Sequence, residues 1–203
     1  MLVCVHDPVV EGLGPIDQLR LSALDDEARS RLLTLEGFLD HLDDADPTRS
    51  VTGVHLDLKD VGYEIDAVDA VLARRRRLFA TTSIANSIAL IRRERPDVDA
   101  FLTIGTSKAG LSGFALARLR LHERFPMRQI RRTRATGIAV HHALATPSLR
   151  RWCQRRGLSV VVWTVDRDDR LEQWLDSDVD VVTTNRPLFA LERRRVRGRS
   201  PGA

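Results

Sequence analysis

Short apolar runs rich in β-branched residues alternate along most of the chain with segments whose apolar residues recur every three or four positions. The first pattern predicts buried strands, and the second predicts amphipathic helices. The predicted strands lie at residues 51–59, 78–82, 101–105, 137–141, 158–163 and 179–184. Because a helical pattern follows each strand, the chain is expected to contain about six βα units around a parallel sheet.

The expected helices are marked by apolar stripes and by signals at their ends. One stripe covers residues 65–72, and Ser83 is expected to cap the helix that follows the second strand. Thr146 is expected to cap a later helix with proline at its first position, and Gly157 is expected to end it. Further stripes lie at 84–91, 111–119, 149–153 and 171–175, and a terminal helix is expected from residue 187.

The first part of the chain does not follow this alternation. Residues 3–8 predict a short strand that ends in His6 and Asp7, and an irregular segment comes after it. Thr34 is then expected to cap a short helix. The inner face of that helix is predicted to carry Leu35, Phe38, Leu39 and Leu42. We interpret this part as an excursion before the first βα crossover.

Polar residues gather where the predicted strands end. Side chains at the carboxyl ends of parallel strands meet on one rim, where barrel enzymes keep their chemistry, so this placement favours a barrel over an open sheet. No glycine-rich dinucleotide or nucleotide motif follows any strand, which counts against the folds that bind those ligands. The residues expected on the rim are Asp57, Lys59, Thr81–Ser83, Thr103, Thr106, His141, His142, Trp163–Asp166 and Thr183–Asn185.

The charge balance is basic, with a formal net charge of +4 at pH 7, and nearly all the positive charge is arginine. Lys59 and Lys108 are the only lysines. The arginine runs 74–77 and 193–195 lie at expected helix ends, where cations favour the helix dipole. No aromatic residues interleave with these runs, as a stacking surface for nucleic acid requires. We therefore expect no nucleic-acid partner, and a basic nucleic-acid module is kept only as a third hypothesis for function.

Neither a secretory signal nor a transmembrane segment is expected. The longest apolar runs, such as 158–165, are far shorter than the roughly 18 residues that a spanning helix needs. The first residues lack the basic head and the long apolar stretch of a signal peptide. Cys4 and Cys153 form no metal-binding spacing, so both are expected to be buried, reduced thiols. These features favour a cytoplasmic protein.

Five motifs follow one another along nearly the whole chain. They are Val-Cys-Val-His-Asp-Pro at 3–8, Leu-Thr-Leu-Glu-Gly-Phe-Leu at 33–39, His-Leu-Asp-Leu-Lys at 55–59, a segment at 157–166 that contains Trp-Thr-Val-Asp, and Thr-Thr-Asn-Arg-Pro at 183–187. In this order they resemble the motifs of the glycerophosphodiester phosphodiesterase family. Two positions depart from the family pattern, because it has glutamate where Asp57 stands and aspartate where Asn185 stands.

The resemblance implies an α/β TIM-type (β/α)₈ barrel that hydrolyses glycerophosphodiesters, its small-molecule substrates, to glycerol phosphate and an alcohol with a divalent cation, Mg²⁺ or Ca²⁺. By the motif match, His6 corresponds to a catalytic histidine that exchanges a proton with the departing alkoxide. Asp57 corresponds to a metal ligand, and the metal would neutralise the phosphodiester charge. Lys59 is expected to meet a phosphate oxygen, and Trp163 to form an apolar wall for the glycerol carbons.

The family pattern begins with segments carrying H-R-G and E-x-D that this sequence lacks, so we expect a barrel without its first two strands and first helix. One carboxylate holds Mg²⁺ or Ca²⁺ poorly, so the metal site is expected to be incomplete. Three explanations stay open: a start placed too late, a truncated gene, and a partner chain or altered site that completes the barrel. The alternative function is a non-catalytic remnant that binds phosphate esters. We expect one barrel domain at 1–196 and a disordered basic tail at 197–203.

Overall fold

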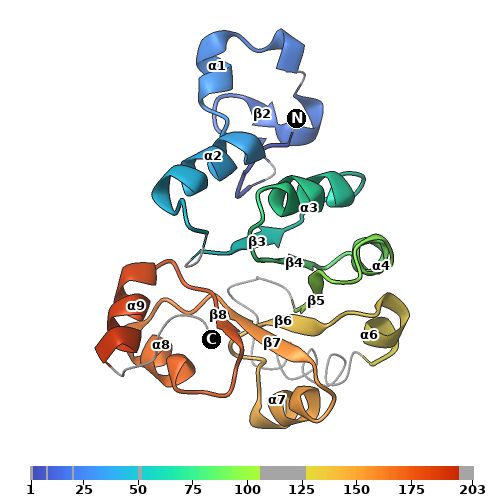
Figure 1. Ribbon diagram of the computed structural model, residues 1–203, viewed down its shortest axis with the longest axis vertical. Coiled ribbons are helices and arrows are strands. Elements are labelled where there is room, and N and C mark those ends of the chain that lie inside the picture. The colour runs from blue at the N-terminus through green and yellow to red at the C-terminus, as the bar shows by residue number, and fades with distance from the viewer. Residues whose placement is uncertain (1, 8, 20, 50–51, 106–126, 197–203) are drawn as a thin grey trace. The chain divides into compact units, whose positions relative to one another are not determined.

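The computed structural model describes residues 2–7, 9–19, 21–49, 52–105 and 127–196 (Figure 1). The chain divides into two compact units, one formed by residues 1–53 with 66–77 and the other by residues 54–65 with 78–203. The helix expected at 111–119 and the disordered tail expected at 197–203 lie outside the described residues.

The second unit is built on a parallel sheet that has six strands in the described part of the chain, in the order β3-β4-β5-β6-β7-β8. Every pair of neighbouring strands is parallel and consecutive in sequence, as in a barrel. The strands are β3 (Val54–Asp57), β4 (Leu78–Thr82), β5 (Asp99–Ile104), β6 (Gly137–His141), β7 (Ser159–Trp163) and β8 (Val181–Val182). The expected partial TIM barrel is therefore confirmed as an α/β half-barrel.

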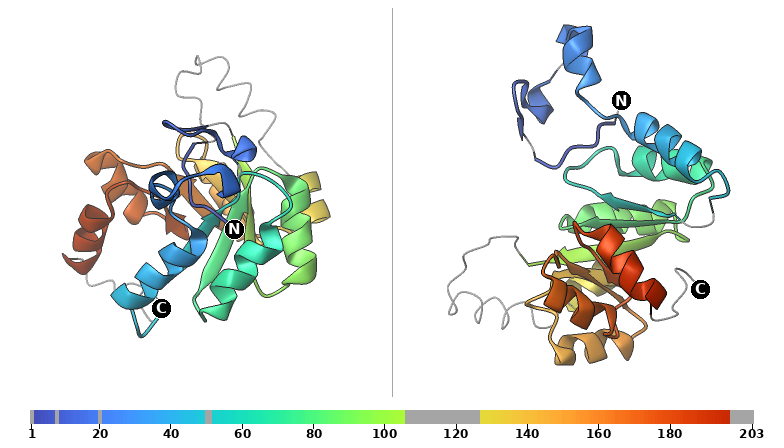
Figure 2. Two further views of the ribbon diagram at one scale, coloured as in Figure 1. Left: turned by 90° about the horizontal axis from the view of Figure 1, so that it is seen from above. Right: turned by 90° about the vertical axis from the view of Figure 1, so that its left-hand side faces the viewer.

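Helices lie outside this sheet (Figure 2). Both faces of the sheet carry buried apolar side chains. Leu102, Ile138 and Val162 on one face are almost fully buried. On the other face Phe101, Ala139 and Val161 form a cluster, against which Phe79, Trp163 and Val181 pack. Burial on both faces explains why the strands read as continuous apolar runs. The helices of this unit are α4 (Ala85–Glu94), α6 (Met127–Thr133), α7 (Pro147–Gln154), α8 (Asp168–Leu175) and α9 (Pro187–Val196).

Specific residues were predicted to cap or end two of these helices, α7 and α4. At α7 the Thr146 hydroxyl accepts the Leu149 N–H (3.3 Å) and Gly157 adopts a φ of 63°, so both predictions are confirmed. At α4 the predicted Ser83 cap is wrong. Ile84 is the N-cap residue, and the Thr82 hydroxyl accepts its N–H (3.1 Å). The Thr82 hydroxyl bonds the amide two residues on, a local bond that threonine forms readily.

The first unit contains α2 (Leu35–Ala45), which begins at Thr34, whose hydroxyl accepts the Gly37 N–H (2.9 Å) as predicted. α3 (Glu64–Ala73) begins in the second unit and continues into the first. Ahead of α2 the irregular segment holds short elements: an antiparallel pair β1 (Val9–Val10) and β2 (Gly14–Pro15), 3₁₀ turns η1 (Ile16–Gln18) and η2 (Leu21–Ala23), and helix α1 (Asp26–Ser30).

The strand predicted over residues 3–8 is wrong in the described part of that segment. A single antiparallel bridge joins Val3 to Thr34, and His6 and Asp7 lie in a bend. The Cys4 N–H donates to the Leu33 carbonyl (2.8 Å), and the Leu35 N–H donates to the Leu2 carbonyl (2.9 Å). The ladder cannot continue because its partner segment becomes helix α2 at Leu35.

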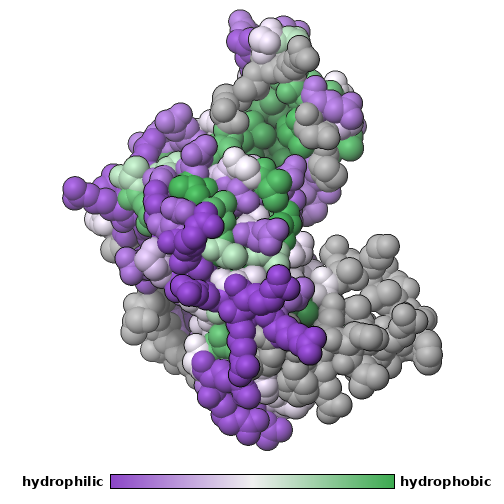
Figure 3. All heavy atoms as spheres, turned by 90° about the vertical axis from the view of Figure 1, so that its right-hand side faces the viewer, coloured by the Kyte–Doolittle hydropathy of each residue, from purple (hydrophilic) through white to green (hydrophobic). Residues whose placement is uncertain are grey.

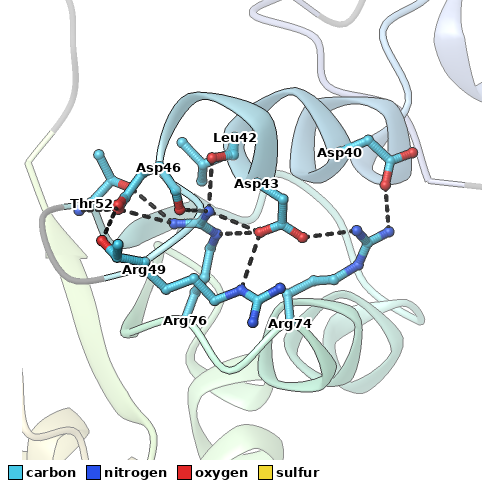
Figure 4. Close-up of polar contacts among 9 residues, drawn as sticks. Asp40, Leu42, Asp43, Asp46, Arg49, Thr52, Arg74 and Arg76 are labelled. Atoms are coloured by element: carbon cyan, nitrogen blue, oxygen red, sulfur yellow. Dashed lines mark hydrogen bonds and ion pairs between the residues drawn. The ribbon is translucent and has the colours of Figure 1, made fainter.

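A buried arginine ties α2 to the segment that follows α3 (Figure 4). The side chain of Arg76 is 0% exposed, and each of its three nitrogens donates to oxygen. Nε donates to Asp43 Oδ1 (2.9 Å), and the terminal nitrogens donate to the Thr52 hydroxyl (2.9 Å) and to the carbonyls of Leu42 (2.7 Å) and Asp46 (3.0 Å). The guanidinium is thereby compensated for its loss of water.

Arg74 completes this cluster from the same segment. It forms ion pairs with Asp40 (2.7 Å) and with Asp43 (3.0 Å). The hydrogen bond from Arg74 is the main reason that the pKa of Asp43 is lowered to about 2; partial burial opposes it, and Arg76 adds to it. The 74–77 run does follow a helix end, since α3 stops at Ala73, and two of its arginines also bind carboxylates of α2.

The two cysteines lie in different environments. Cys153 is buried in α7, and burial raises the pKa of its thiol to about 12. Cys4 is exposed, which corrects the prediction that it is buried. Side chains alternate in an extended segment, and Val3 takes the half-buried side.

We expect an aromatic disulfide reagent to modify one thiol of the native protein and two in denaturant, because only a reachable thiolate reacts. The coloured thiolate that the reagent releases measures the number. The Cys4→Ser variant should release none in the native state. Native-state modification of Cys153 at the rate of Cys4 would contradict this assignment.

Apolar surface remains on the first unit. Val9 and Leu33 are 57% and 50% exposed. Figure 3 shows apolar surface gathered on the uppermost part of one face, in this unit. Among the described helices, none combines the length and the apolarity that crossing a membrane requires.

Candidate functional site

The carboxyl end of β3 places three polar residues on one face of the strand. Val54 and Leu56 of β3, and Leu58 just beyond it, are buried on one side, whereas His55, Asp57 and Lys59 lie on the other. This alternation follows from the two-residue period of an extended chain. It brings Asp57 and Lys59 together, with Lys59 Nζ 2.5 Å from Asp57 Oδ2.

Thr81 of β4 links this pair to His55. Asp57 and Thr81 are partners in the parallel register, and the Thr81 hydroxyl donates to Asp57 Oδ1 (3.1 Å). His55 Nε2 lies 2.8 Å from the same hydroxyl. Because a hydroxyl has one proton, and Thr81 gives it to the carboxylate, it must accept from His55. His55 therefore carries its proton on Nε2.

His55 is an exposed residue whose ring packs against the sheet. Its ring stacks on Phe79 at a centroid distance of 4.4 Å, and Phe79 in turn contacts Phe101. Burial lowers the pKa of His55; the Asp57 charge opposes this shift and the Lys59 charge adds to it. The contact of His55 with the Thr81 hydroxyl orients Thr81 and, through it, Asp57.

The donor groups at Asp57 do not by themselves fit a divalent cation. Mg²⁺ and Ca²⁺ take six or more oxygen ligands, usually with several carboxylates. Both oxygens of Asp57 already bind protein groups, namely the Lys59 ammonium and the Thr81 hydroxyl. Within the described residues, no group of three or more His, Cys, Asp and Glu side chains is arranged to hold a metal. The role of Asp57 as a metal ligand stays a prediction.

An aromatic group lies at the ends of β6 and β7. The ring of His141 meets Trp163 edge-on at 5.4 Å and lies 4.2 Å from the ring of His142. The Ala143 N–H donates to His141 Nδ1 (3.3 Å). Trp163 packs on the same apolar face as Phe79, which agrees with an apolar wall but does not test it. In the described part of the chain, the buried Trp163 Nε1 has no hydrogen-bond partner.

Asp166 joins the ends of β7 and β8. Its Oδ1 accepts the N–H of Asn185 (2.8 Å), and its Oδ2 accepts the Asn185 side-chain amide (3.0 Å). The backbone N–H of Asn185 is the main cause that lowers the pKa of Asp166. An aspartate at 185 would instead face a second carboxylate, so the asparagine that departs from the family pattern has a local partner here.

His6 belongs to the first unit, whereas Asp57, Lys59 and Trp163 belong to the second. The His6 side chain is 96% exposed, and its Nδ1 lies 3.1 Å from Asp7 Oδ1. This contact leaves Nε2 directed away from Asp7. A common site for His6 and Asp57 stays a prediction.

A parallel α/β half-barrel whose polar side chains lie at the carboxyl ends of its strands has the architecture of the barrel enzymes. The chain belongs to the glycerophosphoryl diester phosphodiesterase family, whose sequence profile matches residues 1–188. The resemblance that the motifs carried is thereby confirmed. No curated protein sequence matches the chain.

Solved structures agree on the fold. The chain is similar to a glycerophosphodiester phosphodiesterase from Parabacteroides distasonis (20% identity, TM-score 0.67, covering 97% of this chain and 79% of that chain). It is also similar to one from Agrobacterium tumefaciens (18%, 0.64, 93% and 80%). An Oleispira antarctica phosphodiesterase solved with its product sn-glycerol-3-phosphate is a third neighbour (13%, 0.66, 94% and 79%). At these identities the likeness indicates a shared fold.

Proposed function

We propose that this protein binds glycerophosphodiesters at the carboxyl ends of its strands and hydrolyses them to glycerol phosphate and an alcohol. Family membership over residues 1–188 supports the reaction class. The observation that carries the proposal is the Asp57–Lys59 pair, which presents an ammonium at the rim on a side chain that is 60% exposed. A structural neighbour holds sn-glycerol-3-phosphate, the product expected of this reaction.

In this proposal each residue has a separate task. Lys59 contacts a phosphate oxygen as a point charge, and Trp163 covers the glycerol carbons. Water forms the new bond to phosphorus and releases a proton as the bond to the alkoxide breaks, and His6 gives that alkoxide a proton from Nε2 while Asp7 holds its Nδ1. Asp57 keeps the Lys59 ammonium at the strand end until the anion arrives. A divalent cation is part of the family chemistry, but we derive no step through it because the described donors do not fit one.

A second function, binding of phosphate esters without hydrolysis, is favoured by one observation. Both oxygens of Asp57 are engaged by Lys59 and Thr81. The carboxylate that was expected to bind a metal therefore pairs with the Lys59 ammonium instead. An anion site of this kind requires no metal.

We expect Lys59→Met to weaken binding of glycerol 3-phosphate at least about tenfold, because a charge-assisted contact is lost. Titration calorimetry measures the affinity. His6→Ala should keep the affinity and lose turnover of glycerophosphocholine, followed as release of glycerol 3-phosphate with added Mg²⁺ or Ca²⁺.

The matched control is Arg93→Met, which removes one exposed positive charge from α4 and should leave binding unchanged. Unaltered affinity in Lys59→Met would contradict the phosphate role of Lys59. Binding that persists with no turnover under any cation would support the second function.

A further inference from the structure

The loop between β3 and α3 is held almost entirely by side chains. The first amide, that of Leu58, donates to the Thr81 carbonyl (2.8 Å) of the neighbouring strand. The remaining partners are Tyr63 Oη for the amides of Lys59 and Asp60 (3.1 Å each), Asp60 Oδ1 for Val61 (2.8 Å) and Glu64 Oε2 for Gly62 (2.7 Å). Each amide from 58 to 62 therefore has a partner, and the loop has a defined conformation.

Tyr63 closes this loop on itself. Its hydroxyl oxygen accepts two successive amides that lie three and four residues before it, so the chain must turn back sharply. Gly62, with a φ of 95°, permits that turn because a side chain there would be strained. Two successive N–H groups that converge on one oxygen form a small oxygen-binding nest.

Glu64 anchors the same turn to α4. Glu64 is 3% exposed, and its carboxylate accepts the Gly62 N–H and the Ser87 hydroxyl (2.5 Å). Burial would raise the pKa of Glu64, but the hydrogen bonds from Ser87 and from backbone amides outweigh burial and hold it below its usual value. The bonds of Glu64 thus hold in place the backbone that carries the Tyr63 side chain.

We propose that Tyr63 is a positioning residue for Lys59, because its hydroxyl fixes the backbone from which the ammonium reaches its anion. Lysine has a flexible stem, and in this structure Lys59 is held at two points, its amide by Tyr63 and its ammonium by Asp57. A bound phosphate ester would draw the ammonium from Asp57. The amide anchor then decides where the ammonium can lie. The inference rests on the proposed role of Lys59.

Tyr63→Phe removes only the hydroxyl and is the direct test. We expect it to weaken glycerol 3-phosphate binding about tenfold, as measured by calorimetry. Ser177→Ala is the control elsewhere in the unit: it removes one hydroxyl bond, to the Trp174 carbonyl, whereas Tyr63→Phe removes the acceptor of two amide bonds. Its affinity should stay unchanged, and unaltered affinity in Tyr63→Phe would overturn the proposal.

A double-mutant cycle separates positioning from a general structural effect. In the Lys59→Met background, Tyr63→Phe should cause no further loss of affinity, because the group it positions is absent. An equal loss in both backgrounds would mean that Tyr63 acts independently of Lys59 and would overturn the assignment.

Hydrogen exchange measured without ligand distinguishes failure of the Tyr63 proposal from failure of the proposed function. Selective ¹⁵N-lysine labelling gives two amide signals, and the Lys59→Met variant identifies that of Lys59. Tyr63→Phe should speed hydrogen exchange of the Lys59 amide at least about tenfold. If the unchanged protein binds no glycerol 3-phosphate, the proposed function fails. If exchange in Tyr63→Phe is unchanged, the Tyr63 anchor itself fails.

Discussion

Replacing Arg76 by methionine is expected to lower the free energy of unfolding by about 4 kcal/mol, since removing one member of a buried ion pair leaves the other uncompensated. Arg76 has no exposed side-chain surface, and it binds Asp43 and the Leu42 carbonyl of α2 and Asp46 just after that helix. Methionine fills a similar volume, so lost charge and hydrogen bonds dominate the effect. Urea unfolding followed by far-ultraviolet circular dichroism, which detects the helices of both units, gives the value.

Arg49 supplies a matched control for this variant. It also pairs with Asp43 (3.4 Å), but its side chain is 39% exposed, so water compensates its loss. Arg49→Met should leave the urea midpoint nearly unchanged. Equal midpoint shifts in the two variants would show that burial of Arg76 does not set its contribution.

Gly137→Ala is expected to destabilise the protein by about 3 kcal/mol, because an added methyl group has no room in the sheet. A Cβ at residue 137 would lie 2.4 Å from the Ser159 carbonyl oxygen and 2.8 Å from the Phe101 ring. The oxygen belongs to the backbone of β7, which pairs with β6 at this position. Neither strand can withdraw without loss of its ladder.

Gly157→Ala separates lack of space from backbone strain. Residue 157 has a positive φ, and no atom lies within 4 Å of an added Cβ. It should therefore cost only about 1 kcal/mol, the usual penalty of a left-handed alanine. Thermal or urea unfolding ranks the two variants, and a larger effect at 157 would contradict the crowding at 137.

The sequence predicted those parts of the fold whose signals are local. The β6–α7–β7 region was predicted closely, because Thr146, a following proline and Gly157 mark the helix between two apolar strands. The segment at 3–8 was mispredicted because a strand also needs a partner. Its partner ends where α2 begins, which no pattern within residues 3–8 reveals.

Among the polar residues too, local contacts were predictable and contacts with distant segments were not. The Asp57–Lys59 contact was predictable from their spacing on one strand, whereas the bond from Thr81 depends on the register of β4. Arg76 was interpreted as a helix-end cation because its carboxylate partners lie at least 30 positions earlier in the chain. The role of Tyr63 was missed, although Gly62 before it is a signal for a tight turn.

The interleaved make-up of the first unit has a consequence for synthesis and for dissection of the gene. A ribosome must reach residue 77 before this unit has all its parts, since residues 66–77 belong to it. A fragment cut after residue 53 would hold Asp43 and Asp46 with neither Arg74 nor Arg76 to neutralise them. Expression fragments of this protein should therefore not be divided at that point.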